Sequence, residues 1–278
     1  MSDYGIRLEY LGEKGQDNIA VVTIDRPDRR NVFDEAMFLE LDKVANALKK
    51  KLPRALVITG AGDKAFSAGF DVNPDNPMVK SLMEAVENKD PVPCAAFLKR
   101  LRDPVDKLVG IPVPIICAIN GLAYGGGAEL ASRCDIRVMD SDAMICFSET
   151  KLGLMPDWGG GPALARVVGQ SIATDLLLTA RRVGAEEALS LGIVNRISRK
   201  GEALKEALDL ARSIARNGPT AVRYALSIIR KTNDLPFDEI LELELEKAAA
   251  LIASGECIHG ITAFLTKKEA EFPDIIDK

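Results

Sequence analysis

Three consecutive glycines at positions 125–127 constrain this chain more than any other feature of its sequence. The apolar run at residues 114–119 before them is typical of a buried strand, and residues 127–133 are predicted to form a helix. The glycines therefore form the turn at which a strand is followed by a helix. A helix start presents unpaired N–H groups and a positive dipole end, and glycine lets a ligand approach them closely. The turn is thus suited to hold negative charge, with the carboxylate of Glu129 about one helical turn away.

Alternating elements surround this turn. Apolar and β-branched runs predict further strands at residues 19–25, 55–59, 136–139 and 144–147. Helical spacing of apolar residues predicts helices at 34–51, 95–109, 162–168, 172–180, 185–191, 202–217, 221–232 and 237–254. Residues 73–93, rich in Pro and Asn, are expected to form a mobile surface insertion around one short helix. Because the strands stop near residue 198, we predict an α/β core over residues 1–200 and a helical region over residues 201–278.

Composition excludes several classes of function. The chain carries 36 Lys and Arg against 41 Asp and Glu, a net charge of -5, so it has no global basic field for nucleic acid or an anionic membrane. Its five cysteines form no CxxC pair, which predicts reduced thiols and a cytoplasmic location without a secretory signal. The uncharged window at residues 109–128 contains two prolines and five glycines, so we interpret it as a buried strand and loop rather than a membrane span.

Known glycine-rich motifs do not explain the turn. A dinucleotide-binding loop needs G-x-G-x-x-G, whereas here Gly121 precedes the triplet by four positions, and a phosphate-binding Walker loop needs a Lys-Ser/Thr pair that is missing. The sequence also has no G-x-S-x-G element and no cluster of Cys and His with metal-ligand spacing. We therefore expect neither a metal nor a nucleotide cofactor.

A second turn suggests what the glycines do. The stretch KAFSAGFDV at residues 64–72 also follows a predicted strand, and Ala68-Gly69-Phe70 is a second turn with small residues that can point a backbone N–H outward. Two backbone N–H groups from separate segments can converge on a single oxygen atom. This arrangement is an oxyanion hole, which stabilises negative charge that develops during a reaction.

Four stretches of the sequence together resemble a known family. The stretches KAFSAGFD, AINGLAYGGGAELASRCD, SETKLGLMPDWGG and GITAFLTKK closely resemble the crotonase (enoyl-CoA hydratase/isomerase) superfamily, in its order and spacing, from about residue 19 to 272. The resemblance implies a spiral of repeated β-β-α units and a helical C-terminal region that assembles homotrimers, often paired into hexamers. It also implies an acyl-CoA thioester as substrate, with no cofactor beyond the coenzyme A of that substrate.

The same resemblance assigns roles to individual residues. The N–H groups of Phe70 and Gly126 match the pair that binds the thioester oxygen and stabilises the enolate. Glu129 and Glu149, 20 positions apart, match the two catalytic glutamates that hold a water molecule in family hydratases. Such acid–base work needs raised pKa values, which burial and mutual proximity of the carboxyl groups would supply.

The sequence departs from the hydratase pattern in two places. Ser148 stands where hydratases usually have proline, and Asp157 stands where they usually have glycine. Dienoyl-CoA isomerases place a catalytic aspartate at the position of Asp157, although an aspartate after proline is also ordinary turn chemistry. Hydration of a 2-enoyl-CoA is our preferred prediction. The alternatives that stay open are an enoyl- or dienoyl-CoA isomerase using Glu149 and Asp157, a hydrolase of a ring 1,3-diketone-type acyl-CoA, and a non-catalytic RNA-binding relative.

Contacts to the rest of the substrate follow from family position. Local cations must meet the phosphates of coenzyme A in this acidic chain, and the C-terminal ones could reach a neighbouring subunit's site. Trp158, the only tryptophan, is expected either to line the acyl pocket or to fill the core. The predicted substrate contacts are Arg29, Lys64, Ala68, Phe70, Asp71, Gly125, Trp158 and Lys268.

Overall fold

A six-stranded sheet forms the centre of the structure, a computed structural model that describes residues 5–12 and 15–274. Its strand order is β1-β2-β3-β5-β7-β10, in which only β1 runs antiparallel to its neighbour. The strands are β1 (Gly5–Tyr10), β2 (Ile19–Asp25), β3 (Ala55–Gly60), β5 (Ile115–Ile119), β7 (Ile136–Asp140) and β10 (Arg196–Ser198). Strands β3 and β5 are buried throughout, as expected of parallel strands covered on both faces.

A second, four-stranded sheet has the order β4-β6-β8-β9. It contains β4 (Ala65–Ser67), β6 (Leu122–Tyr124), β8 (Met144–Cys146) and β9 (Val183–Gly184). Each of β4, β6 and β8 follows one long strand of the first sheet after a short connection, so the chain alternates between the sheets as it advances. This repetition confirms the predicted α/β fold with β-β-α units.

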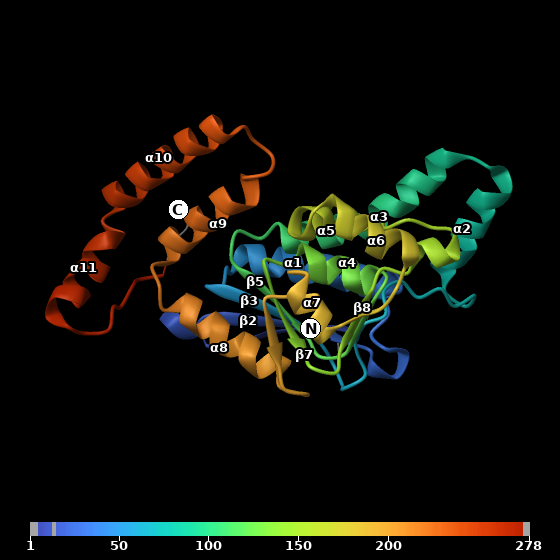
Figure 1. Cartoon of the computed structure of the whole chain (residues 1–278), viewed down its shortest axis with the longest axis horizontal. Helices are drawn as coiled ribbons and strands as arrows, with labels where there is room; N and C mark the ends of the chain where they lie inside the picture. The colour runs from blue at the N-terminus through green and yellow to red at the C-terminus, as the bar shows by residue number, and fades with distance from the viewer. Residues whose placement is uncertain (1–4, 13–14, 275–278) are drawn as a thin grey trace.

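Helices cover both faces of the large sheet (Figure 1). The helix α8 (Ala203–Ala215) lies on one face, where four alanines at every fourth position allow close packing against the sheet. The other side of the sheet carries α1 (Glu35–Lys50), α3 (Pro91–Val109), α4 (Gly126–Arg133), α5 (Gly160–Val168) and α6 (Gln170–Thr179). The shorter elements are α7 (Ala185–Ser190), η1 (Gly15–Asp17), η2 (Pro27–Arg29) and η3 (Glu149–Leu152).

The last three helices extend away from this core (Figure 1). They are α9 (Pro219–Lys231), α10 (Phe237–Ser254) and α11 (Glu256–Thr266). Arg230 of α9 is anchored to the core because its guanidinium group bonds the Asp135 carboxylate and the Ile111 carbonyl oxygen. No single helix within residues 5–12 and 15–274 has the length and apolar character needed to cross a membrane, whereas α10 and α11, bent by 69° at their junction, meet those criteria only as a pair.

The structure differs from the sequence prediction mainly in short elements. Strands β4 and β6 have three residues each, too few for a periodic pattern to be visible. The segment at 73–93 contains the 12-residue helix α2 (Pro77–Asn88), and α3 begins at Pro91 because Asp90 caps it. Strand β1 and helix α11 are additional elements. The proposed division at residue 200 stays a prediction, and α8 packs against the sheet of the preceding segment.

Candidate active site

The glycine triplet is packed too closely for larger residues. Gly125 adopts a positive φ of 53°, and its N–H donates to the carbonyl oxygen of Cys146 in β8. A Cβ atom on Gly127 would lie 2.1 Å from the carbonyl oxygen of Ser67 in β4. The triplet is therefore held between the strands β4 and β8 of the small sheet, and α4 starts from it at Gly126.

The second predicted turn contacts the first. Phe33 donates its N–H to Gly69 and accepts the N–H of Asp71, a parallel bridge that leaves the N–H of Phe70 on the opposite side. A Cβ atom on Gly69 would lie only 2.7 Å from the nitrogen of Gly126. Among the described residues, neither the N–H of Phe70 nor that of Gly126 has a hydrogen-bond acceptor. The structure thus brings together the two predicted donors and leaves both available to a ligand.

Glu129 is the most firmly held carboxylate at this site. Its side chain is 1% exposed and accepts N–H groups from Asp157 at 3.2 Å, Trp158 at 2.9 Å and Gly160 at 2.9 Å. A Cβ atom on Gly160 would lie 2.4 Å from the Glu129 Cβ. Only glycine at position 160 therefore allows the turn to come close enough to donate these bonds.

Glu149 lies in the same site but is held differently. It starts η3, directly after the small sheet, and both of its carboxyl oxygens are buried without a hydrogen-bond partner among the described residues. A Cβ atom on Gly125 would lie 3.4 Å from Glu149 Oε1, which places this carboxyl group against the glycine turn. An unsatisfied buried carboxyl group is costly, so it indicates a position prepared for a ligand or water.

Burial raises the pKa of all three carboxyl groups. Burial raises the pKa of Glu129 to about 8, and the charges of Glu149 and Asp157 add to the increase, although the Gly160 and Asp157 N–H groups oppose it. Burial also raises the pKa of Glu149. Burial and the charge of Glu149 together raise the pKa of Asp157 to about 6. The site therefore collects three acidic groups with raised pKa values, and those of Glu129 and Asp157 lie near neutral pH.

Trp158 has a structural position rather than an open one. Its side chain is 2% exposed and packs edge-on against Phe33 and Phe38, with ring centroids 5.4 and 5.1 Å away. A Cβ atom on Gly126 would lie 2.8 Å from the Trp158 ring. The indole thus packs in the core behind the glycine turn, and its contact with substrate stays a prediction. Its contribution to the site is the backbone N–H that binds Glu129.

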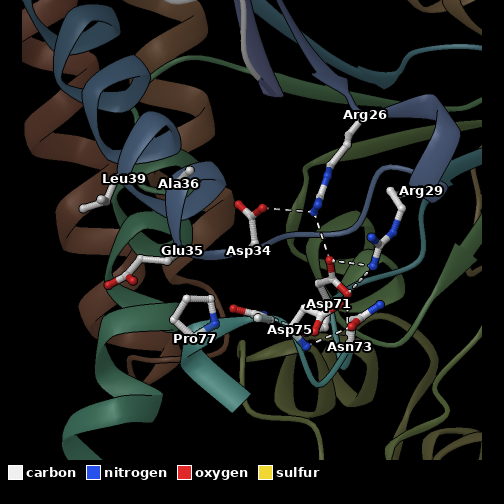
Figure 2. Close-up of a pocket in the computed structure, with 11 residues that line it drawn as sticks. Arg26, Arg29, Asp34, Glu35, Ala36, Leu39, Asp71, Asn73, Asp75 and Pro77 are labelled. Carbon is white, nitrogen blue, oxygen red and sulfur yellow. Dashed lines mark hydrogen bonds and ion pairs between the residues drawn. The ribbon is translucent and has the colours of Figure 1, made fainter. Parts of the chain in front are cut away.

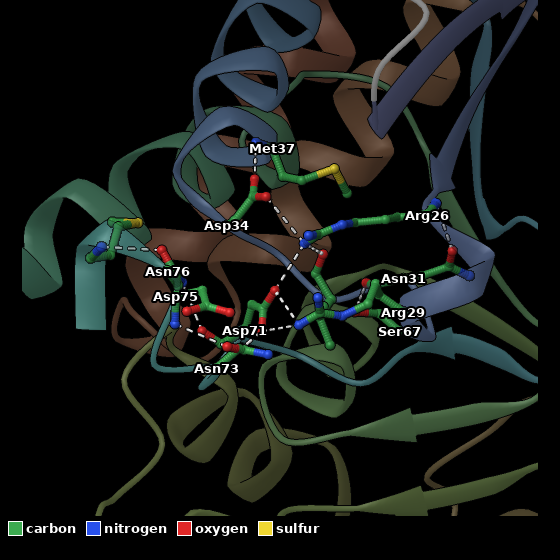
Figure 3. A network of polar contacts seen from close by, with 12 residues as sticks. Arg26, Arg29, Asn31, Asp34, Met37, Ser67, Asp71, Asn73, Asp75 and Asn76 are labelled. Atoms are coloured by element: carbon green, nitrogen blue, oxygen red, sulfur yellow. Dashed lines mark hydrogen bonds and ion pairs between the residues drawn. The ribbon is translucent and has the colours of Figure 1, made fainter. Parts of the chain in front are cut away.

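Two of the predicted coenzyme A contacts, Arg29 and Asp71, lie together at an open pocket of about 430 Å³ between η2 and the N-termini of α1 and α2 (Figure 2). The buried Asp71 carboxylate pairs with both Arg29 and Arg26, and it also accepts the N–H of Asn73 (Figure 3). The side chain of Arg29 is 44% exposed, so its outer side is accessible. Asp71 therefore orients the two arginines, and its charge is already matched.

The remaining predicted contacts are more dispersed. Ala68 donates its N–H to the carbonyl oxygen of Arg30, which fixes the turn before Phe70. Lys64 and Lys268 are both exposed. Lys268 follows α11, which Figure 1 places far from α4, so the structure does not bring it to Glu129 of the same chain. Its predicted role would require a second subunit.

The role of the turn at residues 157–160 as the binding partner of Glu129 was not predicted from the sequence. The backbone of this turn, rather than a side chain, binds Glu129, and Arg133 bonds the turn from the other side. A signal was present in the pair Gly159-Gly160, since adjacent glycines before a helix resemble the first glycine turn.

Comparisons with known proteins identify the relatives of this chain. Residues 14–275 match the family model described as Enoyl-CoA hydratase/isomerase. The chain is 32% identical over 254 residues to the short-chain-enoyl-CoA hydratase of Clostridium acetobutylicum, a match that covers 91% of this chain and 93% of that protein. It is 34% identical over 257 residues to the carnitinyl-CoA dehydratase of Escherichia coli, with 91% and 94% covered.

Solved structures give the same result. The crystal structure of an enoyl-CoA hydratase from Bacillus anthracis superposes with a TM-score of 0.85 at 28% identity, covering 97% of this chain and 99% of that one. An enoyl-CoA hydratase structure from Geobacillus kaustophilus has a TM-score of 0.81 at 32% identity, with 99% of both chains covered.

Proposed function

Because this chain belongs to the enoyl-CoA hydratase/isomerase family, we propose that it is a hydratase that adds water across the double bond of a 2-enoyl-CoA. The observation that carries the proposal is the position of two buried glutamates beside two backbone N–H groups that have no acceptor in the described part of the chain. The relatives at 32–34% identity are named for hydration or dehydration of CoA thioesters, which supports the same class of reaction.

The backbone donors bind the thioester oxygen. In this proposal, the N–H groups of Phe70 and Gly126 both donate to that oxygen, whose negative charge grows as the enolate forms. These donors are fixed before substrate arrives, since Phe33 holds one turn and the small sheet holds the other. Preorganised donors of this kind commonly contribute about 10²–10³ in rate.

The two glutamates divide the proton transfers. Three N–H groups favour the ionised form of Glu129 and oppose the rise of its pKa to about 8, whereas the Glu149 carboxyl is buried without a hydrogen-bond partner among the described residues. In the proposed step, the ionised form of Glu129 accepts a proton from water as the oxygen bonds Cβ. Glu149 gives its proton to Cα, and the thioester carbonyl is restored. The net change is addition of one water, and reprotonation between the glutamates completes the cycle. No cofactor beyond the coenzyme A of the substrate takes part.

Isomerisation is a second candidate because of Asp157. Burial and the charge of Glu149 raise the pKa of this third carboxyl group to about 6, so Asp157 could exchange a proton with substrate. An isomerase would move a proton between two carbons through Glu149 and Asp157 without consuming water. The diketone hydrolase and the RNA-binding alternatives gain no specific support from the described residues.

We also propose that the protein is a homotrimer, or a hexamer of two trimers. Large apolar side chains are exposed along the C-terminal helices, including Leu241, Leu245, Ile258, Ile261 and Phe264. A surface of this kind is typical of an interface. Assembly would also explain how Lys268 could reach the coenzyme A of a neighbouring site. A cytoplasmic location is proposed from the five free cysteines.

The test is incubation of the protein with 2-enoyl-, 3-enoyl-, 2,4-dienoyl- and 3,5-dienoyl-CoA thioesters, followed by mass spectrometry. Hydration predicts a product heavier by one water from the 2-enoyl substrates. Products of unchanged mass but altered double-bond position would instead assign isomerisation. Conversion of none of the thioesters would reject the proposal.

A further inference from the structure

The end of α4 bonds the turn that binds Glu129. Arg133 lies four residues after Glu129 on the same helix, so both side chains point to the same side. The Arg133 guanidinium donates to the carbonyl oxygen of Trp158 at 2.7 Å, and the Trp158 N–H donates to Glu129 at 2.9 Å. A single peptide segment is thus held at both ends by one helix.

The guanidinium group is itself fixed on its other sides. A Cβ atom on Gly159 would lie 3.2 Å from Arg133 Cζ, so the group packs directly on the centre of the turn. Asp106 of α3 pairs with Arg133 at 2.6 Å, and the arginine side chain is only 18% exposed. Charge-assisted bonds at these distances are stronger and more directional than neutral ones.

We propose that Arg133 is a positioning residue that keeps the N–H groups of the 157–160 turn aimed at the Glu129 carboxylate. Its consequence for catalysis rests on the proposed hydratase function, whereas its effect on Glu129 does not. Arg133 acts through the backbone of Trp158 and Gly160 and reaches Glu129 by no direct bond.

The proposal makes a claim about proton affinity as well as packing. The charged groups that face Glu129 are Glu149 from η3 and Asp157 from the turn, and both raise its pKa, whereas the N–H donors lower it. If the 157–160 turn moves away from Glu129, its N–H groups bond the carboxylate less strongly, while the charges of Glu149 and Asp157 still raise the pKa of Glu129. The pKa of Glu129 should then rise further. A residue that only packed the turn for stability would leave this pKa unchanged.

The kinetic test compares Arg133→Met and Arg133→Lys with Arg212→Met, which removes an exposed arginine of α8. We expect Arg133→Met to lower kcat by about 10–100-fold, because a misplacement near 1 Å costs about this much. KM should change by less than about threefold, and the lysine variant should recover part of kcat because it keeps a donor for the Trp158 carbonyl. The acidic limb of the kcat profile should move to higher pH. A folded Arg133→Met protein with unchanged kcat and pH profile, like Arg212→Met, would overturn the proposal.

A second measurement needs no substrate. The pKa of Glu129 can be followed by titration of carbon-13-labelled glutamate carboxyls, with Glu129→Gln used to assign the signal. A higher pKa in Arg133→Met supports the positioning role even if no thioester is hydrated, so the two proposals fail separately. If Arg133→Met does not fold, Asp106→Asn replaces it, since loss of that pair should shift the same pKa upward by a smaller amount. An unchanged pKa of Glu129 in a folded variant rejects the positioning role of Arg133.

Discussion

Glu129 and Glu149 lie in one buried site but are held differently: Glu129 accepts three backbone N–H groups, whereas neither carboxyl oxygen of Glu149 lies within hydrogen-bond geometry of a partner among the described residues. The charge of Glu149 contributes to the raised pKa of Glu129, so the two groups affect each other. Two neighbouring buried carboxylates are costly when both are ionised, and sharing one proton relieves that cost. The backbone donors favour the ionised form of Glu129 and so oppose the rise of its pKa to about 8. In the proposed hydration, Glu129 accepts a proton from water and Glu149 gives one to Cα.

The first prediction concerns stability. Burial raises the pKa of Glu149 above its value of 4.5 in an unfolded chain, so the folded protein binds this proton more tightly. The resulting stabilisation is present below about pH 4.5 and is lost as the pH rises through the higher folded pKa. Glu149→Gln removes the titrating carboxyl group, so the variant does not lose this stability as the pH rises. We expect the melting temperature of the variant to exceed that of the wild type by more at about pH 8 than at about pH 5.

Thermal melts at both pH values check this expectation, with Glu87→Gln on the exposed surface of α2 as the control. The control should change the melting temperature little at either pH. A Glu149→Gln difference that is the same at both pH values would mean that Glu149 is not strained by its burial.

The second prediction separates hydration from isomerisation. Glu129→Gln and Glu149→Gln should each lower turnover of a 2-enoyl-CoA by about 10²–10⁴-fold, since each removes one acid–base group. Asp157→Asn should cost less than about tenfold, because its N–H to Glu129 is retained. Steady-state rates of the three folded variants decide the question. An Asp157→Asn protein as inactive as Glu149→Gln, with Glu129→Gln still active, would favour the isomerase.

The third prediction concerns assembly. Phe264 on α11 is 83% exposed and belongs to the apolar surface of the C-terminal helices. A charge placed there would have to be buried in an interface, which is unfavourable without a partner. Phe264→Glu should therefore lower the molar mass measured by light scattering from a trimer or hexamer to smaller species. Lys205→Glu, at an exposed position of α8, should leave it unchanged. If the wild-type protein has the molar mass of a monomer in the same measurement, the proposed trimer or hexamer is rejected.

Local sequence was sufficient for the parts of the site that are contiguous. Strand β5 and helix α4, which lie on either side of the glycine turn, are long enough for a sequence pattern to show, although the short strand β6 between them was not predicted. The spacing from Gly126 to Glu129 is set by one helical turn. The family resemblance supplied the pairing of Phe70 with Gly126, which lie 56 positions apart but in neighbouring turns.

The contacts that only the fold creates could not be predicted in this way. No local pattern relates Phe33 to Phe70, since their bridge depends on how two loops meet. The Trp158 ring was ambiguous because an indole suits a core and a pocket equally, and its burial against Phe33 and Phe38 is visible only in the fold. The backbone bonds from the 157–160 turn carry no side-chain signature, so their importance became visible only in three dimensions.

The last prediction concerns the spacing between the two backbone donors. Gly69 has a φ of +81°, and a Cβ atom there would lie 2.7 Å from Gly126 N and 2.9 Å from the carbonyl oxygen of Tyr124. Backbone atoms cannot rotate away as a side chain can, so Gly69→Ala must push the two turns apart. The N–H groups of Phe70 and Gly126 would then no longer converge on one oxygen. We expect a loss in kcat of about 10²-fold, comparable to the loss of one donor.

The matched control is Gly192→Ala. Gly192 has a similar φ of +77°, but a Cβ atom there meets nothing within 4 Å. Both variants carry the backbone strain of alanine in a left-handed conformation, about 1–2 kcal/mol of stability. Only Gly69→Ala also separates the donors, so comparison of kcat at equal folded fraction isolates that effect. Equal activity in the two variants would show that the oxyanion-binding groups lie elsewhere, because the strain alone would then account for both.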